Sequence, residues 1–66
     1  MSAVEEAIWV LLSIAGQRYT THVRFAPGAM SEADARARAR FHAWLTIAAP
    51  LLIPYSLVQV VDSHRK

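Results

Sequence analysis

Hydrophobic and polar positions follow different periods in successive parts of the chain, and the clearest lies in residues 18–25, RYTTHVRF. In an extended backbone, strict alternation places Tyr19, Thr21, Val23 and Phe25 on one face and Arg18, Thr20, His22 and Arg24 on the other. β-Branched and aromatic residues in this pattern are typical of a half-buried strand. A proline and a glycine follow and favour a turn, so we predict a strand over about residues 18–26.

The preceding segment, about residues 7–14, is hydrophobic at both odd and even positions. Ile8, Val10 and Ile14 are β-branched, and Trp9 and Leu11 occupy positions between them. A short apolar run of this kind favours a strand that is covered on both sides. A short loop with a glycine then joins it to the next strand as a hairpin.

A helix over residues 3–15 is the alternative for the same segment. Ser2 and Glu5 have the spacing of a capping box, and Gly16 stands where a glycine commonly ends a helix. This alternative turns the predicted order ββαβ into αβαβ.

A helix is predicted over about residues 32–49. Ser31 can cap its first backbone N–H groups, and Glu32 and Asp34 lie in the first turn, where the helix dipole favours negative charge. Pro50 is expected to end it. The run ARARARFHAW, residues 35–44, therefore lies on a helix, and its arginines do not share one face.

The helix is expected to pack on the sheet through one apolar stripe. That stripe has three- and four-residue spacing, with Leu45 at its margin, and consists of Ala33, Ala37, Phe41, Trp44 and Ala48. On either side of it, Arg36 and Arg38 lie four residues after Glu32 and Asp34, which predicts two ion pairs. Arg40 has no acidic residue at that spacing.

The last strand is predicted over about residues 55–62, followed by a basic tail at 63–66 and preceded by the apolar connection PLLIP. Together these elements predict one small α+β domain. Its three-stranded antiparallel sheet has the order 2-1-3, with the first strand in the centre, the charged second strand at an edge and the helix on one face.

Size and composition indicate that the domain associates with something. A chain of 66 residues buries only about 60% of its unfolded surface, and no cysteine is present to supply a disulfide or a thiolate metal site. Yet 55% of the residues are hydrophobic and the formal net charge is only +2. Disorder is excluded on this balance, and nucleic acid is permitted rather than required.

One helix covers one face of the sheet, so we expect the other face to be a contact surface. Trp9 and Leu11 should emerge there beside Leu57 or Val58, as an apolar patch. Arg18, His22 and Arg24 form one margin. The predicted function is a non-enzymatic interaction module that inhibits or scaffolds a larger protein partner, with a homodimer as its expected state. A second partner-binding patch is predicted in PLLIPY, at Leu51, Leu52, Ile53 and Tyr55.

Candidate catalytic and metal-binding groups are sparse. His22, His42 and His64 lack the spacing of metal ligands. Glu32 and Asp34 are accounted for by the start of the helix, so a paired acid and base is not evident. The sequence therefore predicts no enzyme activity, no metal and no cofactor.

Two alternatives to protein binding stay open. Nucleic acid is the first, with Arg18, His22, Arg24 and Arg40 as the candidate contacts. A membrane span is the second, because residues 44–61 carry no charge, although two prolines and a glutamine interrupt them. Acidic residues near the N-terminus argue against a secretory signal, and a cytoplasmic location is expected.

Overall fold

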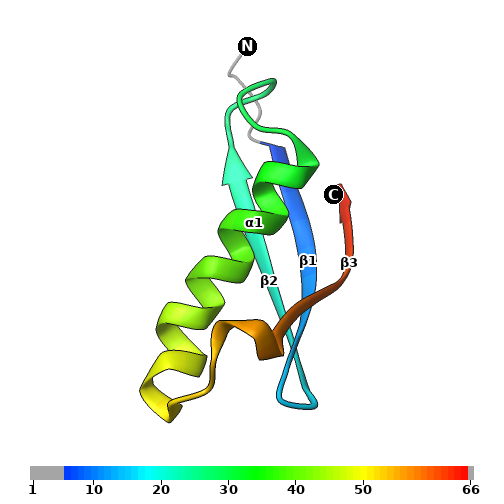
Figure 1. Cartoon of the computed structure of the whole chain (residues 1–66). Helices are drawn as coiled ribbons and strands as arrows, with labels where there is room; N and C mark the ends of the chain where they lie inside the picture. Colours follow the sequence, from blue (N-terminus) through cyan, green and yellow to red (C-terminus); the bar gives the residue numbers. More distant parts are fainter. Residues whose placement is uncertain (1–5, 66) are drawn as a thin grey trace.

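The computed structural model describes residues 6–65 as a three-stranded antiparallel sheet with a helix on one face (Figure 1). The elements are β1 (Glu6–Ile14), β2 (Gln17–Phe25), α1 (Glu32–Ala43), a π-helical turn (Trp44–Ala48), two 3-10 turns (Ala49–Leu51 and Tyr55–Leu57) and β3 (Val58–Arg65). The strand order is β2-β1-β3. The predicted ββαβ fold and the central position of the first strand are confirmed. A helix over residues 3–15 is wrong from Glu6 onward, and the Ser2–Glu5 capping pattern lies outside the described residues.

The β1–β2 hairpin turns through Ala15 and Gly16, with φ angles of 50° and 86°. Two successive positive φ values define the type I′ turn, whose twist matches that of the strands it joins. The register runs from Ile14 opposite Gln17 to Glu6 opposite Phe25. Because paired residues share a face, Trp9 and His22 lie side by side on one side of the sheet.

The third strand begins and ends later than the sequence predicts. Residues 55–57 form a 3-10 turn, and β3 then runs through most of the predicted basic tail to Arg65. The prediction failed because strand pairing, rather than local polarity, sets this end: β1 offers a free edge as far as Ile8, which pairs with Arg65. The Arg65 guanidinium also contacts the Glu6 carboxylate at 2.6 Å. A shift in register between Leu11 and Leu12 marks a β-bulge.

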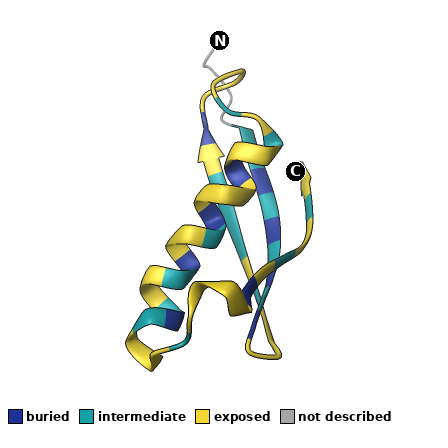
Figure 2. Cartoon of the chain, viewed as in Figure 1, coloured by how far each residue is buried: buried dark blue, intermediate teal, exposed yellow. Residues whose placement is uncertain are grey.

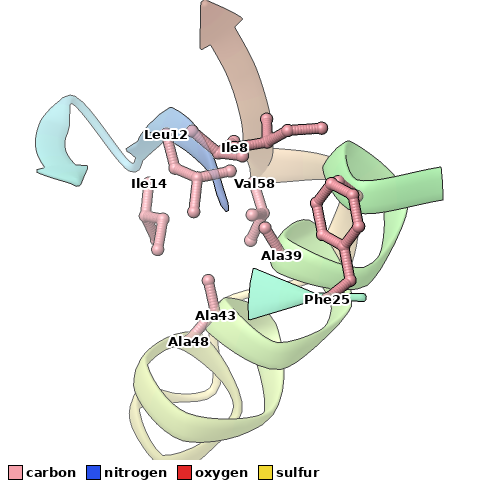
Figure 3. Close-up of a cluster of buried hydrophobic side chains, with 10 residues drawn as sticks. Ile8, Leu12, Ile14, Phe25, Ala39, Ala43, Ala48 and Val58 are labelled. Atoms are coloured by element: carbon pink, nitrogen blue, oxygen red, sulfur yellow. The ribbon is translucent and has the colours of Figure 1, made fainter. Parts of the chain in front are cut away.

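The core lies between the helix and the even-numbered residues of β1 (Figure 3). Ile8, Val10, Leu12 and Ile14 are fully buried, as is Val58 at the start of β3. The buried residues of the helical segment are all small, namely Ala35, Ala39, Ala43 and Ala48, and Trp44 and Ile47 pack half-buried against the same core. Large side chains come from the sheet and small ones from the helix, so the two layers approach closely.

The buried helix stripe differs from the predicted one in its first three members, whereas Ala48 is buried and Trp44 packs against the core as predicted. Ala33 and Ala37 are exposed, and so is Phe41, while Ala35 and Ala39 face the sheet (Figure 2). The ARARAR run puts alanines on two stripes with the same four-residue spacing, so local pattern cannot choose between them. The structure selects the stripe that keeps the phenyl ring of Phe41 out of the interface, where it would hold the helix away from the sheet.

A π-helical turn extends this buried stripe past α1. Ala48 follows Ala43 by five residues rather than four, and the Ala49 N–H donates to the Trp44 carbonyl, also five residues back. The wider turn keeps Ala48 on the sheet side although the α-helical period would carry it away.

The start of α1 is fixed as predicted by Ser31, whose hydroxyl accepts from the Asp34 N–H at 3.1 Å. Glu32 is bound from two directions: the Ser63 hydroxyl donates to it at 2.6 Å, and the Arg36 guanidinium lies at 3.8 Å. The Glu32–Arg36 pair is thus confirmed. The Asp34–Arg38 pair, of two described residues, is not formed, since Asp34 sits at the cap.

Pro50 lies inside the first 3-10 turn and does not end the helix. The helical segment ends instead at Leu52, where the backbone becomes left-handed. The predicted membrane span over 44–61 is divided here among turns and a strand, and no helix within residues 6–65 is long and apolar enough to cross a membrane.

Candidate protein-binding surfaces

The side of the sheet opposite α1 is the first candidate surface, and we call it the open sheet face. It carries Trp9 and Leu11 from β1 and Arg18, His22 and Arg24 from β2, as the sequence predicts. Among residues 6–65, the helical elements pack on the other side of the sheet (Figure 1). Trp9 and Leu11 are half-buried by their neighbours, whereas Arg18 and Arg24 are exposed.

Three side chains of the open sheet face are coupled to one another. The rings of Trp9 and His22 lie 4.5 Å apart between centroids, with their planes tilted by 37°. Arg24 Nε donates to His22 Nε2 at 3.1 Å. The indole, the imidazole and the guanidinium therefore form one continuous row of side chains, which is apolar at β1 and cationic at the edge of the sheet.

The β3 side of this face is more polar than expected. Trp9 pairs with His64 and Leu11 pairs with Asp62. Leu57 or Val58 was predicted to lie beside them, but Leu57 precedes β3 and Val58 is buried on the helix side. The bulge and the extension of β3 cause this difference, because they move polar residues of the predicted tail into register with β1. The apolar part of the open sheet face is consequently narrow.

The larger apolar surface lies where the helical segment ends, and we call it the apolar end. It comprises Phe41, Leu45, Leu51, Leu52, Tyr55 and Leu57, each of which is exposed. In Figure 2 the end of the helical segment and the turns after it are mostly exposed. Of the predicted second patch, Leu51, Leu52 and Tyr55 belong to it, while Ile53 packs against the core.

Leu52 is the most exposed side chain of this surface, at 91%. Its backbone has φ 61° and ψ 29°, the left-handed region in which glycine is usual. The Leu52 N–H donates to the Ala49 carbonyl and the Ile53 N–H to the Ala48 carbonyl, the two hydrogen bonds of a Schellman motif. A leucine at this position takes no part in core packing, and its backbone conformation carries a strain of about 1 kcal/mol.

Aromatic contacts hold the apolar end in shape. Trp44 lies 6.0 Å from Phe41 and 5.9 Å from Tyr55, measured between ring centroids. The Trp44 indole N–H donates to the Ile53 carbonyl at 3.2 Å. The chain reversal after the helix is therefore a built structure with a fixed apolar surface.

Arg40 has a structural position in this arrangement. Its Nε donates to the Val58 carbonyl at 2.6 Å and its Nη2 to the Tyr55 carbonyl at 3.4 Å. The guanidinium also stacks over the Tyr55 ring at 4.2 Å. Arg40 is thus on the helix layer, apart from Arg18 and Arg24, although the sequence grouped all three as nucleic-acid contacts.

Sequence reasoning missed Phe41 and Leu45 as surface residues, and it placed Leu57 on the open sheet face rather than at the apolar end. Phe41 and Leu45 were assigned to the core stripe or its margin, and their four-residue spacing does not show which stripe faces the sheet. Leu57 was placed within a strand that in fact begins at Val58.

The described residues 6–65 contain no group of three His, Asp or Glu side chains arranged to hold a metal ion. Fold and surfaces together define a small α+β domain with an exposed apolar end and a cationic sheet face. No protein-family model, curated protein or solved structure matches the chain.

Proposed function

We propose that the chain is a non-enzymatic protein–protein interaction module that binds a larger protein through its apolar end. The observation that carries this proposal is Leu52, which is 91% exposed in a strained backbone conformation. Folding alone would favour glycine at this position. A leucine that costs stability and packs on nothing within its own domain is explained by a contact with another molecule.

The surroundings of Leu52 support a protein as that molecule. Leu51, beside it, is 66% exposed, and Phe41 is 53% exposed. Aromatic and aliphatic side chains held on a rigid support are the anchors typical of protein interfaces, which gain affinity by filling pockets on the partner. Binding at this end would place the module on its partner, to inhibit or to scaffold it.

The test is capture of partners from the source cell's lysate by the tagged chain, with and without nuclease. Leu51→Ser combined with Leu52→Ser should abolish recovery of a stoichiometric protein while leaving the fold intact, because both side chains are exposed. Val61→Ser, which changes an exposed residue at the β-bulge, is the matched control and should retain the partner. A partner that survives the double substitution would contradict the proposal.

The homodimer expected from the sequence is proposed on the open sheet face. A two-fold axis parallel to the strands would bring Trp9 and Leu11 against their own copies on the axis. It would also set the cationic β2 of one protomer against β3 of the other, which carries Asp62. An axis across the strands would instead oppose β2 to β2 and place arginine against arginine, so electrostatics favours the first arrangement.

Nucleic-acid binding is the second candidate, favoured by the row of side chains formed by Trp9, His22 and Arg24 on the open sheet face. Cations can contact phosphates there while the indole offers a stacking surface. Affinity for single-stranded nucleic acid should then fall steeply with salt, and Arg18→Ala with Arg24→Ala should flatten that dependence. An unchanged salt slope in the double variant would count against this candidate.

A further inference from the structure

A groove of about 260 Å³ lies between β2 and the helical segment, on a different side of the molecule from the open sheet face. Tyr19 and Thr21 form its β2 wall, Ala43 and Ile47 form its helical wall, and Leu12 lies at its floor. The helical wall is built mainly from small side chains, which explains why the groove stays unfilled. It has room for small apolar side chains from outside the domain.

The groove runs along an unpaired strand edge. Within residues 6–65, β2 pairs with β1 alone and forms one edge of the sheet. In a two-residue hairpin the residues that flank the turn form a hydrogen-bonded pair, and bonded and non-bonded pairs then alternate. This alternation directs the backbone N–H and C=O groups of Arg18, Thr20, His22 and Arg24 outward, where an added strand can bond to them.

Among the described residues, positive charge exceeds negative charge along this edge. Residues 7–31 and 35–61 contain no Asp or Glu. β2 carries Arg18 and Arg24, and on the helix Arg38 lies one turn before His42, which lines the groove, with Asp34 one turn further away. The acidic side chains Glu6 and Glu32 bind groups of β3 instead, at the other edge.

We propose that the β2 edge and its groove bind an extended segment of a partner protein with alternating apolar and acidic residues, which adds to the sheet as a fourth strand. Side chains of an added strand alternate between the two faces of the sheet. Those on the helix side enter the groove against Tyr19, Thr21 and Ile47. Those on the other side lie next to Arg18 and Arg24, within the distance of a cross-strand pair.

The geometry specifies the segment further. Arg18 and Arg24 are six residues apart on one face of β2, so the matching carboxylates are also six residues apart. Between the two carboxylates, small apolar residues such as valine occupy the positions whose side chains point to the helix side of the sheet. This site is separate from the apolar end, so it goes beyond the proposed function and does not depend on it.

The experiment measures binding of a synthetic peptide about nine residues long. It carries two glutamates six residues apart, and valines at the positions between them whose side chains point to the opposite face. A second peptide has lysine in place of both glutamates. The wild-type chain should bind the glutamate peptide and not the lysine peptide, with affinity read by calorimetric titration at low ionic strength.

Substitutions in the chain locate the binding site. Arg18→Gln with Arg24→Gln should weaken binding about three- to tenfold, since two cross-strand ion pairs are lost. Arg36→Gln with Arg65→Gln removes the same charge from the β3 side and should leave the affinity unchanged. Thr46→Trp, which fills the groove from the exposed helical surface, should abolish binding.

Three results would overturn the inference. They are no binding of the glutamate peptide, equal weakening by the two arginine pairs, and peptide binding that survives Thr46→Trp. Self-association that persists in Trp9→Asp and that the peptide reverses would also overturn it, in favour of a second copy at the edge. The Leu51→Ser/Leu52→Ser variant should still bind the peptide. Failure of this inference can therefore be distinguished from failure of the proposed function at the apolar end.

Discussion

Arg40 shows how one side chain can fix a connection that the local sequence leaves undefined. Its guanidinium ties α1 to the carbonyl groups of Tyr55 and Val58 and stacks on the Tyr55 ring. A planar, forked donor is needed for these contacts together, and an ammonium group cannot make them all. The route of the chain from helix to β3 therefore depends on arginine at this position.

We predict that Arg40→Lys lowers the free energy of unfolding by about 1–2 kcal/mol, because a half-buried carbonyl loses its donor and the stacking is lost. Denaturant unfolding would measure this. Arg38→Lys, at an exposed helix position without such contacts, should change it by less than about 0.5 kcal/mol. Equal effects of the two substitutions would contradict the structural role of Arg40.

At Leu52, stability and function are expected to change in opposite directions. Leu52→Gly relieves the left-handed strain and should raise the free energy of unfolding by about 0.5–1 kcal/mol, while it removes a contact from the apolar end. Leu51→Gly, in the helical turn beside it, should lower stability by a similar amount. Thermal unfolding of the two variants distinguishes the sites, and a loss of stability in both would contradict the argument.

At the scale of elements, the helix and the sheet divide the core between small and large side chains. Ala35, Ala39 and Ala43 let the helix backbone approach Ile8 and Leu12 closely. Little space is left for a longer side chain on this stripe. Two of these alanines, Ala39 and Ala43, also line the groove beside β2, so the packing of the helix and the proposed peptide site have one origin.

Two leucine substitutions test which helix stripe faces the sheet. Ala39→Leu should lower the free energy of unfolding by about 1–3 kcal/mol, because the core is overpacked. Ala37→Leu, on the exposed stripe, should change it by less than about 0.5 kcal/mol. The opposite ranking in denaturant unfolding would restore the stripe of Ala33, Ala37 and Phe41.

At the scale of the whole molecule, binding surfaces take up much of a very small domain. Within residues 6–65 the core has ten buried hydrophobic residues, four of them alanines, so the stability of the domain is expected to be low. The apolar end is separate from the open sheet face and the β2 edge, which share Arg18 and Arg24. A chain of this size can therefore contact more than one molecule at once.

The proposed homodimer makes stability depend on concentration, because association stabilises only the folded state. We predict that the unfolding midpoint of the wild-type chain rises as the protein concentration is increased. Trp9→Asp places charges at the two-fold axis and should remove this dependence together with dimerisation in sedimentation equilibrium. A midpoint independent of concentration, or a dimer that persists in Trp9→Asp, would exclude dimerisation through the open sheet face.

The sequence by itself determined the second strand with its two faces and the helix that follows, and it favoured a strand over the alternative helix in the first segment. The signals are local, namely the period-two alternation in residues 18–25, the two-sided apolar run of 7–14 and the Ser31 cap. Each of them depends only on local backbone geometry. For the same reason Arg18, His22 and Arg24 could be placed on one face with Trp9 and Leu11 before any tertiary contact was known.

Only the tertiary structure decided which alanine stripe is buried, where β3 begins and ends, and which apolar residues remain outside. The two alanine stripes have the same spacing, so the choice between them depends on the volume left by the β1 side chains. The limits of β3 depend on the free edge of β1, and Leu52 adopts a left-handed conformation because the chain reverses onto Trp44 and Arg40. Each is a contact between residues distant in sequence, which no local pattern encodes.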